Sequence, residues 1–489
     1  MPDVAIAAPN ESAAEAGERA ARAGGNAVDA ALAAALVTMV TEVGIVSLSS
    51  GGFVTVQPQA GPAYTVDGWM DVPGRDGVPP GNSWDIATQY GGGLEITIGP
   101  GSVAVHGALA SFGTAHRRDG RLPWAEIVAP AIHVASSGFA LGSASRFYLD
   151  YVHDDLFGWD PGSRAALHDE AGALITGPIR LPDLVRSLRV IADEGPNAMH
   201  TGELARLISA DVTARGGLLS MADLAEYRPM VRPALPVRLG GWELATVPAP
   251  SVGGVCLAAM LRLLAENPHR HWDDAARAWL VRVQRAVLGH RLNVLDASTD
   301  LAEDARRFLE LIDDDPGSVL ESGSTAHVSA VDSDGVACSV TVSSGYGSGM
   351  IAEGTGIWLN NCLGEHELNP ARRNDRPAGS RLLSNMAPTV ARHRDGATLA
   401  VGSPGADRIT TAISQVLSGY FSGQLSLSEA VRHPRVHVHR AGRSDEQIKI
   451  ETDLSMYFGG VGVALVGPDG ELDAVADPRR DGATRIVRH

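Results

Sequence analysis

The stretch Glu321-Ser-Gly-Ser-Thr325-Ala-His327 holds the residues best suited to covalent chemistry. A threonine hydroxyl is a weak nucleophile until a base removes its proton, and one available base is the threonine's own α-amino group. That amine is free only if the backbone is cut just before the threonine, and its pKa of about 8 then suits it to accept a proton. Cleavage between Ser324 and Thr325 would meet this requirement, which is one interpretation of the stretch. The competing interpretation, an ordinary β-branched residue at the head of a strand, holds for most threonines in such a place.

Two histidines, in His437-Val-His439, could supply half of a metal site, because alternate residues of a strand share a face. No third ligand lies near them in the sequence, so we interpret them as solvated or packed side chains. The loop from Gly402 to Arg408 lacks the Gly-Lys-Ser/Thr of a phosphate-binding loop. We therefore expect neither a metal nor another cofactor.

The elements that must position Thr325 can be predicted from residue alternation and turn signals. In chain order they are a strand at 326–331, a hairpin turn at 332–335, a return strand at 336–343, a strand at 397–401, a loop at 402–405 and a helix at 409–421. A buried hairpin would hold the new terminus rigidly, next to a loop that enters a helix.

The first two thirds of the chain are richer in helix. Helices are predicted at 13–23, 27–41, 104–118, 182–194, 202–215 and 273–295, with strands at 53–57 and 63–66. Asn10 or Ser12 can cap the first of these helices and Asn26 the second. Because no run of alternating strand, helix and strand is evident, the pattern favours a layered α+β fold over a doubly wound one.

Composition narrows the class of protein further. The net charge of −17 argues against nucleic acid as a partner, because phosphate contacts need clustered Lys and Arg. Three widely spaced cysteines form neither a disulfide framework nor a zinc pattern. The N-terminal stretch lacks the basic start and apolar core of a secretory signal, and no stretch is apolar and long enough to span a bilayer. We expect a cytoplasmic protein with no membrane contact.

Seven short blocks, in the same order along the chain, resemble those of the γ-glutamyltranspeptidase family. They are Gly24-Gly-Asn-Ala-Val-Asp-Ala-Ala31, Pro250-Ser-Val-Gly-Gly254, Thr325-Ala-His327, Gly354-Thr-Gly-Ile-Trp-Leu-Asn-Asn361, Ser384-Asn-Met-Ala-Pro-Thr389, Gly402-Ser-Pro-Gly-Ala406 and Asp477-Pro-Arg479. The resemblance implies a four-layer αββα sandwich of the N-terminal-nucleophile hydrolase type. It also implies a large segment, 1–324, and a small segment, 325–489, which together form one folded unit.

The resemblance assigns catalytic roles residue by residue. Thr325 stands where the family has its nucleophile, and its freed amine would be the general base. Gly405 and Ala406 would offer backbone N–H groups to an oxyanion, since their loop enters a helix. Ser343 falls near a threonine that positions the nucleophile, in a loop that is shorter here than in the family.

The substrate-binding positions match the family less closely. Glu365 stands where an acidic residue holds the α-amino group of a glutamyl substrate, and Ser384 and Asn385 stand where a Ser-Ser pair binds its α-carboxylate. Cys362 replaces a glutamine that also meets the amino group. Arg75 is the nearest candidate for the arginine that clamps the carboxylate, and a solvated loop charge is the equal alternative.

These assignments predict a cofactor-free, self-processing amide hydrolase or acyltransferase, which acts on a small amino-acid-like substrate through a threonyl acyl-enzyme. Two alternatives stay open. One is a specialised acylase or metabolite-tailoring hydrolase on the same scaffold, and the other is an unprocessed pseudoenzyme that serves as a binding protein.

Overall fold

The computed structural model describes residues 1–77, 81–88, 93–266, 273–314, 325–368, 376–405, 407–422, 425–439 and 444–489. Two antiparallel sheets form its centre. The first has the order β19 (Ala483–Val487), β1 (Val4–Ala8), β9 (Ala326–Asp332), β10 (Ala337–Ser343), β2 (Gly51–Gln57), β3 (Tyr64–Gly68) and β6 (Met230–Pro233). The second has the order β18 (Leu472–Val475), β17 (Gly462–Val466), β14 (Thr398–Gly402), β13 (Thr389–His393), β8 (Trp242–Thr246) and β7 (Leu235–Leu239).

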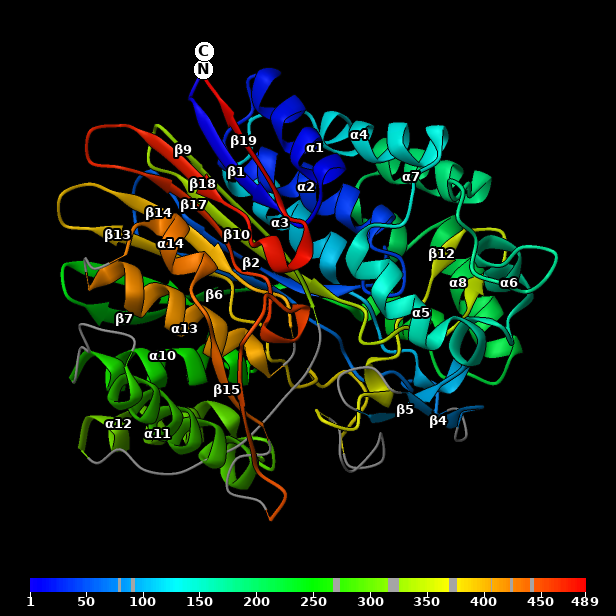
Figure 1. Ribbon diagram of the computed structural model, residues 1–489. Coiled ribbons are helices and arrows are strands. Elements are labelled where there is room, and N and C mark those ends of the chain that lie inside the picture. The colour runs from blue at the N-terminus through cyan, green and yellow to red at the C-terminus, as the bar shows by residue number, and fades with distance from the viewer. Residues whose placement is uncertain are drawn as a thin grey trace.

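The two sheets pack face to face and helices cover both outer faces. Strands β9 and β10 of the first sheet contact β17 and β14 of the second. Helices α1 (Glu11–Arg22), α2 (Ala27–Thr41) and α3 (Ala108–Asp119) pack on the first sheet, and α10 (Val252–Glu266) and α13 (Arg408–Phe421) pack on the second. Figure 1 shows α1 and α2 in blue on one side of the sheets, with α10 in green and α13 in orange on the other. This confirms the predicted four-layer αββα sandwich.

Further helices extend the outer layers. They are α4 (Trp124–Ser137), α5 (Ser143–Phe157), α6 (Pro161–Leu167), α7 (Pro182–Glu194), α8 (Glu203–Ala214), α9 (Met221–Glu226), α11 (Asp274–His290), α12 (Leu301–Asp314) and α14 (Leu427–Arg432). Three small two-stranded sheets pair β4 (Trp84–Thr88) with β5 (Leu94–Ile98), β11 (Ile351–Ala352) with β12 (Ile357–Trp358), and β15 (Val436–His439) with β16 (Gln447–Ile450). Among the described residues, no helix is long and apolar enough to cross a membrane.

Helix α2 packs against the centre of the first sheet. The Asn26 side chain accepts hydrogen bonds from the first turn, and the Asp29 side chain accepts one from the Asn26 backbone, so the helix begins in a capping box. All of its residues are buried. Their small alanine side chains let the helix approach β9 and β10 closely. The strand that would carry the nucleophile therefore has a fixed backing.

Both segments of the chain contribute strands to both sheets. In the first sheet, β9, β10 and β19 come from 325–489, and the other four strands come from 1–324. Strand β1, which the sequence analysis did not predict, lies between β9 and β19. The helical region also contains β6, β7 and β8, which were missed as well.

Candidate active site

Thr325 lies at the head of β9 and is buried, with 1% of its surface exposed. The last paired residues of the hairpin are Ala326 and Val342, so the register points to Ser343 as the neighbour of Thr325 on the adjacent strand. Ser343 in turn pairs with Gly51 of β2, and its hydroxyl accepts a hydrogen bond from the Gly345 N–H at 3.0 Å. The structure thus brings together two predicted catalytic residues. Ser324 lies outside the described residues.

His327, two residues after Thr325, connects the hairpin to the second sheet. Its Nε2 is 2.7 Å from the Ser329 hydroxyl, which donates to the Gly462 carbonyl, so Nε2 carries the proton. Its Nδ1 lies 2.9 Å from the Thr341 hydroxyl, which can donate to it. Complete burial lowers the pKa of His327 to about 3 and keeps the ring neutral. We infer a positioning role, because both ring nitrogens are occupied by strand residues.

The same imidazole packs against the loop predicted to bind the oxyanion. A methyl group added at Gly402 would lie 2.3 Å from His327 Cε1, so only glycine allows this close approach. Gly405 has a φ of +117° and its Cα faces Gly459 so closely that a side chain would clash. Ala406 lies outside the described residues. The contact between His327 and Gly402 fixes the start of this loop relative to the strand of Thr325.

Asn360 and Asn361 organise the site, although the sequence analysis gave them no role of their own. The Asn360 amide donates to the Ser49 and Ala104 carbonyls, and its Oδ1 accepts from Ala104 and Cys362 N–H groups. The Asn361 Oδ1 accepts from the Tyr346 N–H at 2.6 Å, in the loop that follows Ser343. The sequence signal that could have revealed this role is the pair of asparagines directly after the apolar residues 357–359.

Glu365 is a buried acid that lies beside the loop after Ser343. Its carboxyl group contacts Gly345, where an added Cβ would be 3.1 Å from Glu365 Oε1. The Cys362 thiol hydrogen-bonds to this carboxyl group. Burial raises the pKa of Glu365 to about 8, which the Cys362 contact opposes and the Glu367 charge reinforces. Oε1 has no hydrogen-bond partner among the described residues.

Ser384 and Asn385 lie in the chain between Leu382 and Met386, two members of the apolar cluster that contains Cys362. That cluster consists of Phe53, Trp69, Met70, Val72, Ala104, Val247, Cys362, Leu363, Leu382 and Met386. The Ser384 carbonyl accepts from the Ser251 hydroxyl at 3.1 Å and the Gly253 N–H at 3.2 Å. Asn385 is 4% exposed, and neither of its amide atoms has a hydrogen-bond partner within the described ranges. An unpartnered buried amide is costly unless a ligand or water meets it.

Arg75 is placed differently from the other predicted substrate residues. Its side chain is one-third exposed, with Asp223 at 3.9 Å, and its guanidinium lies against Gly379. Asp223 is its ion-pair partner, and no ion pair links it to Glu365 in the part of the chain that the structure describes. The clamp role of Arg75 stays a prediction.

Arg381 is the buried arginine nearest to Ser384 in the sequence. It pairs with Asp71 at 2.7 Å and Asp67 at 3.3 Å, and it stacks over Tyr227. Its charge is therefore already balanced by two carboxylates.

No third ligand lies near His437 and His439 in the sequence, but the fold brings one close to them in space. Asp407, thirty residues earlier, places its Oδ2 2.9 Å from His437 Nε2 and 3.5 Å from His439 Nδ1. Sequence spacing could not reveal this, because Asp407 precedes α13 and the histidines are on β15, which packs against that helix.

Comparison with known proteins identifies the family of the chain. The sequence pattern of the family described as gamma-glutamyltranspeptidase matches residues 13–487. A glutathione hydrolase proenzyme of Pseudomonas aeruginosa is 30% identical, over 99% of this chain and 94% of that protein. An acylase ACY 1 proenzyme of Pseudomonas sp. (strain V22) is also 30% identical, over 96% and 91%.

One solved structure shows the same fold over nearly the whole chain. Cephalosporin acylase from Bacillus halodurans superposes with a TM-score of 0.78 at 22% identity, over 99% of this chain and 96% of that one. The family match includes every strand of the two sheets except β1, and the relative from Pseudomonas aeruginosa aligns with 99% of the chain. This chain belongs to the γ-glutamyltranspeptidase family.

Proposed function

We propose that this chain is the precursor of a threonine-nucleophile enzyme that cleaves a γ-glutamyl-type amide by hydrolysis or acyl transfer. The observation that carries the proposal is the position of Thr325. It is buried at the head of β9 beside Ser343, while His327 of the same strand packs against Gly402 of the candidate oxyanion loop. Acyl transfer requires the nucleophile and the oxyanion donors to be held in fixed relative positions, and this contact would do so.

The chemistry follows from the freed terminus. Scission before Thr325 exposes its α-amine, which takes the proton of its own hydroxyl as the oxygen attacks the amide carbonyl. Backbone N–H groups near Gly405 would stabilise the tetrahedral oxyanion. The amine then passes the proton to the leaving nitrogen, and an ester to Thr325 forms. Water or an acceptor amine attacks this ester and releases the acyl group.

The acyl group is proposed to carry an amino-acid head. The Glu365 carboxyl group, with Oε1 open and Gly345 against it, suits a substrate ammonium. Asn385, with both amide atoms open in the described structure, can donate to a carboxylate and accept from an ammonium. Both side chains are buried, so a ligand that leaves them unpaired would bind weakly.

The first test concerns processing. Freshly purified wild-type protein should contain two pieces, residues 1–324 and 325–489, when measured by denaturing mass spectrometry. Thr325→Ala should remain one full-length chain because it has no hydroxyl to attack the preceding carbonyl. An intact chain in active wild-type enzyme would refute the mechanism, and a single band in inactive protein would favour the pseudoenzyme.

The second test concerns the substrate. Glu365→Gln should lower kcat/KM for a donor with a free α-amine roughly 100-fold, which corresponds to about 3 kcal/mol of transition-state binding. Self-cleavage should persist in this variant, because that step involves no free substrate. Glu353→Gln is the matched control, since it makes the same substitution at an exposed glutamate.

A specialised acylase is the second candidate function. Acylase relatives match as well as glutathione hydrolases do, and Cys362 stands where the family has a glutamine. If wild-type enzyme prefers acyl donors without an α-amine, and Glu365→Gln leaves their turnover unchanged, the acylase replaces the γ-glutamyl enzyme. A chromatographic screen of γ-glutamyl and glutaryl amides separates the two.

A further inference from the structure

A cluster of three possible metal ligands lies where β15 packs against α13. Its members are Asp407, His437 and His439. Each offers one ligand atom, and these atoms all lie within 4.8 Å of one another. Ligand atoms around a tetrahedral zinc ion are separated by about 3.3 Å, given bond lengths near 2.0–2.1 Å. The distances from Asp407 Oδ2 to the two histidines, 2.9 and 3.5 Å, lie on either side of this value.

The outer contacts of these ligands are those of a metal site. His437 Nδ1 is 3.2 Å from the Thr411 hydroxyl, which donates to the Arg408 carbonyl, so Nδ1 can donate to Thr411 and leave the Nε2 lone pair toward Asp407. The second oxygen of Asp407 pairs with Arg408. Such partners orient ligating imidazoles and carboxylates. The arginine also draws charge from the carboxylate, which lowers the affinity for a cation.

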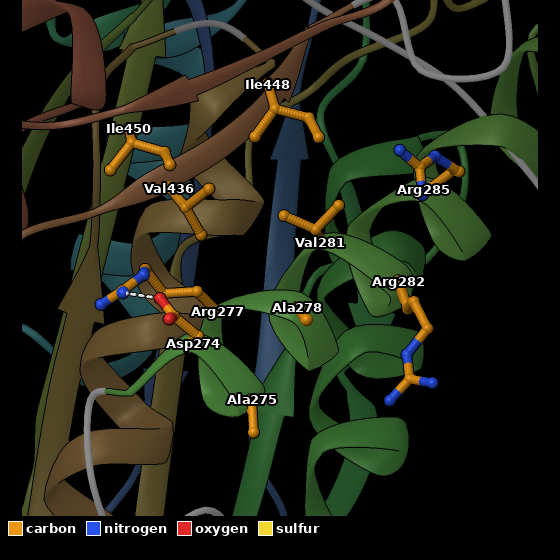
Figure 2. Close-up of a pocket in the computed structure, with 10 residues that line it drawn as sticks. All are labelled: Asp274, Ala275, Arg277, Ala278, Val281, Arg282, Arg285, Val436, Ile448 and Ile450. Atoms are coloured by element: carbon orange, nitrogen blue, oxygen red, sulfur yellow. Dashed lines mark hydrogen bonds and ion pairs between the residues drawn. The ribbon is translucent and has the colours of Figure 1, made fainter.

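Strand β15 holds the two histidines in a fixed orientation. Gln284 of α11 and Gln415 of α13 each bond to the Val436 backbone, and Gln284 also accepts from the Val438 N–H. Figure 2 shows Val436 on the side that faces α11, together with Ile448 of β16 and Val281. Because side chains alternate along a strand, His437 and His439 lie on the other side of β15, toward Asp407.

We propose that Asp407, His437 and His439 bind one divalent transition-metal ion of the zinc class. Two imidazole nitrogens and one carboxylate suit zinc, cobalt or nickel and disfavour the all-oxygen ions calcium and magnesium. Asp407 and His437 are buried, and His439 is one-quarter exposed, so an ion could reach the site from the side of His439, with water as a fourth ligand.

The ion would have a structural role beyond the proposed reaction. Asp407 comes two residues after Gly405, so a metal bond at Asp407 would tie the end of the candidate oxyanion loop to β15. No step of the proposed mechanism passes through the metal. The site and the proposed activity can therefore succeed or fail independently.

The test uses untagged full-length protein that has been stripped with a chelator and dialysed. Titration with Co²⁺ alone should give the intense visible absorption of a four-coordinate ion at one equivalent, and Zn²⁺ should bleach it. Zn²⁺ should also raise the Tm by a few degrees, because it binds the folded state. His439→Gln and Asp407→Asn should each weaken Co²⁺ binding at least 10-fold, while His133→Gln, which removes an exposed histidine of α4, should not.

His439→Gln keeps the test valid if the buried Asp407→Asn variant fails to fold, because its side chain is partly exposed. The circular dichroism of each variant without metal should match that of the wild type. Absence of the Co²⁺ spectrum in wild-type protein, or an unchanged spectrum in His439→Gln, would overturn the proposal. Loss of the spectrum in His133→Gln would assign the ion to the surface and overturn it equally.

Discussion

Glu365 and His327 are two buried ionisable side chains of the candidate site, and they differ in how completely they are hydrogen-bonded. Each ring nitrogen of His327 has a hydroxyl group of a strand residue within hydrogen-bond distance, so the neutral ring is fixed in place. Glu365 has the Cys362 thiol at its carboxyl group and an open Oε1. A side chain whose hydrogen bonds are complete serves structure, whereas one left incomplete in a buried place is suited to a ligand.

The raised pKa of Glu365 predicts how stability depends on pH. With a pKa near 8 in the folded protein and an ordinary value of 4.5, the native state binds the extra proton between these pH values. The free energy of unfolding should therefore fall as pH rises through this window, with a slope of at most about 1.4 kcal/mol per pH unit. Glu365→Gln should remove that slope.

This comparison is best made in the uncleaved Thr325→Ala chain, by urea unfolding at pH values from about 5 to 9. The stability of Glu365→Gln relative to its parent should increase up to about pH 8 and then level off. Parallel curves for the two proteins would mean that the Glu365 carboxyl group is solvated or already paired in the folded state.

At the scale of elements, the contact between His327 of β9 and Gly402 at the end of β14 fixes the candidate oxyanion loop relative to Thr325. Gly402→Ala would place a methyl group against the His327 ring. The two residues belong to packed strands, β14 and β9, which cannot easily move apart to make room. We expect about 1–3 kcal/mol of destabilisation from overpacking, and losses in both self-cleavage and turnover because the loop shifts relative to Thr325. Rates of precursor cleavage and of amide turnover measure the two effects.

Gly177→Ala is the matched control, since no atom lies within 4 Å of the position of its added Cβ and its backbone is not left-handed. That variant should process and turn over like wild type. Normal activity in Gly402→Ala would show that the His327 contact does not position the loop.

Elements with strong local signals were predicted well from the sequence. Helix α2 begins after Asn26 and ends at Thr41 as expected, and the hairpin of β9 and β10 turns at Gly335 with a φ of +81°. Strand β1 was missed because it is buried on both faces and shows no polar alternation. Its pairing with β9 and β19 joins distant parts of the chain, which local patterns cannot reveal.

The same distinction applies to the site. The sequence analysis gave roles to Thr325 and Ser384 because each belongs to a recognisable block, and to Glu365 because it follows the block that ends at Asn361; these roles stay predictions. The grouping of Asp407 with His437 and His439 depends on how α13 packs against β15, and the sequence contains no mark of it. The apolar cluster around Cys362 likewise joins residues from Phe53 to Met386.

At the scale of the whole molecule, the proposed scission would cut a chain whose two segments share both sheets. In the first sheet β1 lies between β9 and β19, and β10 pairs with β2. We predict that segments 1–324 and 325–489 stay associated after cleavage, because separation would break these three ladders and the β8–β13 ladder of the second sheet, and would expose the apolar core between the sheets. Size-exclusion chromatography of processed protein should give a single peak that contains both pieces.

Mild urea that leaves secondary structure intact should not release either segment. Recovery of a folded, isolated 325–489 segment under native conditions would contradict the prediction, because β9 and β10 would then have lost their partners β1 and β2.

The neighbouring ends of the chain have a consequence for engineering. Val4 pairs with Val487, the His489 N–H donates to Asp3 at 2.8 Å, and both ends emerge side by side in Figure 1. A short linker from His489 to Met1 would close the backbone into a ring, and the ring could be opened between Ser324 and Thr325. A gene reordered in this way would encode Thr325 directly after the initiator methionine. Removal of that methionine would supply the free amine without any autocatalytic step, so a circular permutant would separate maturation from turnover in a single polypeptide.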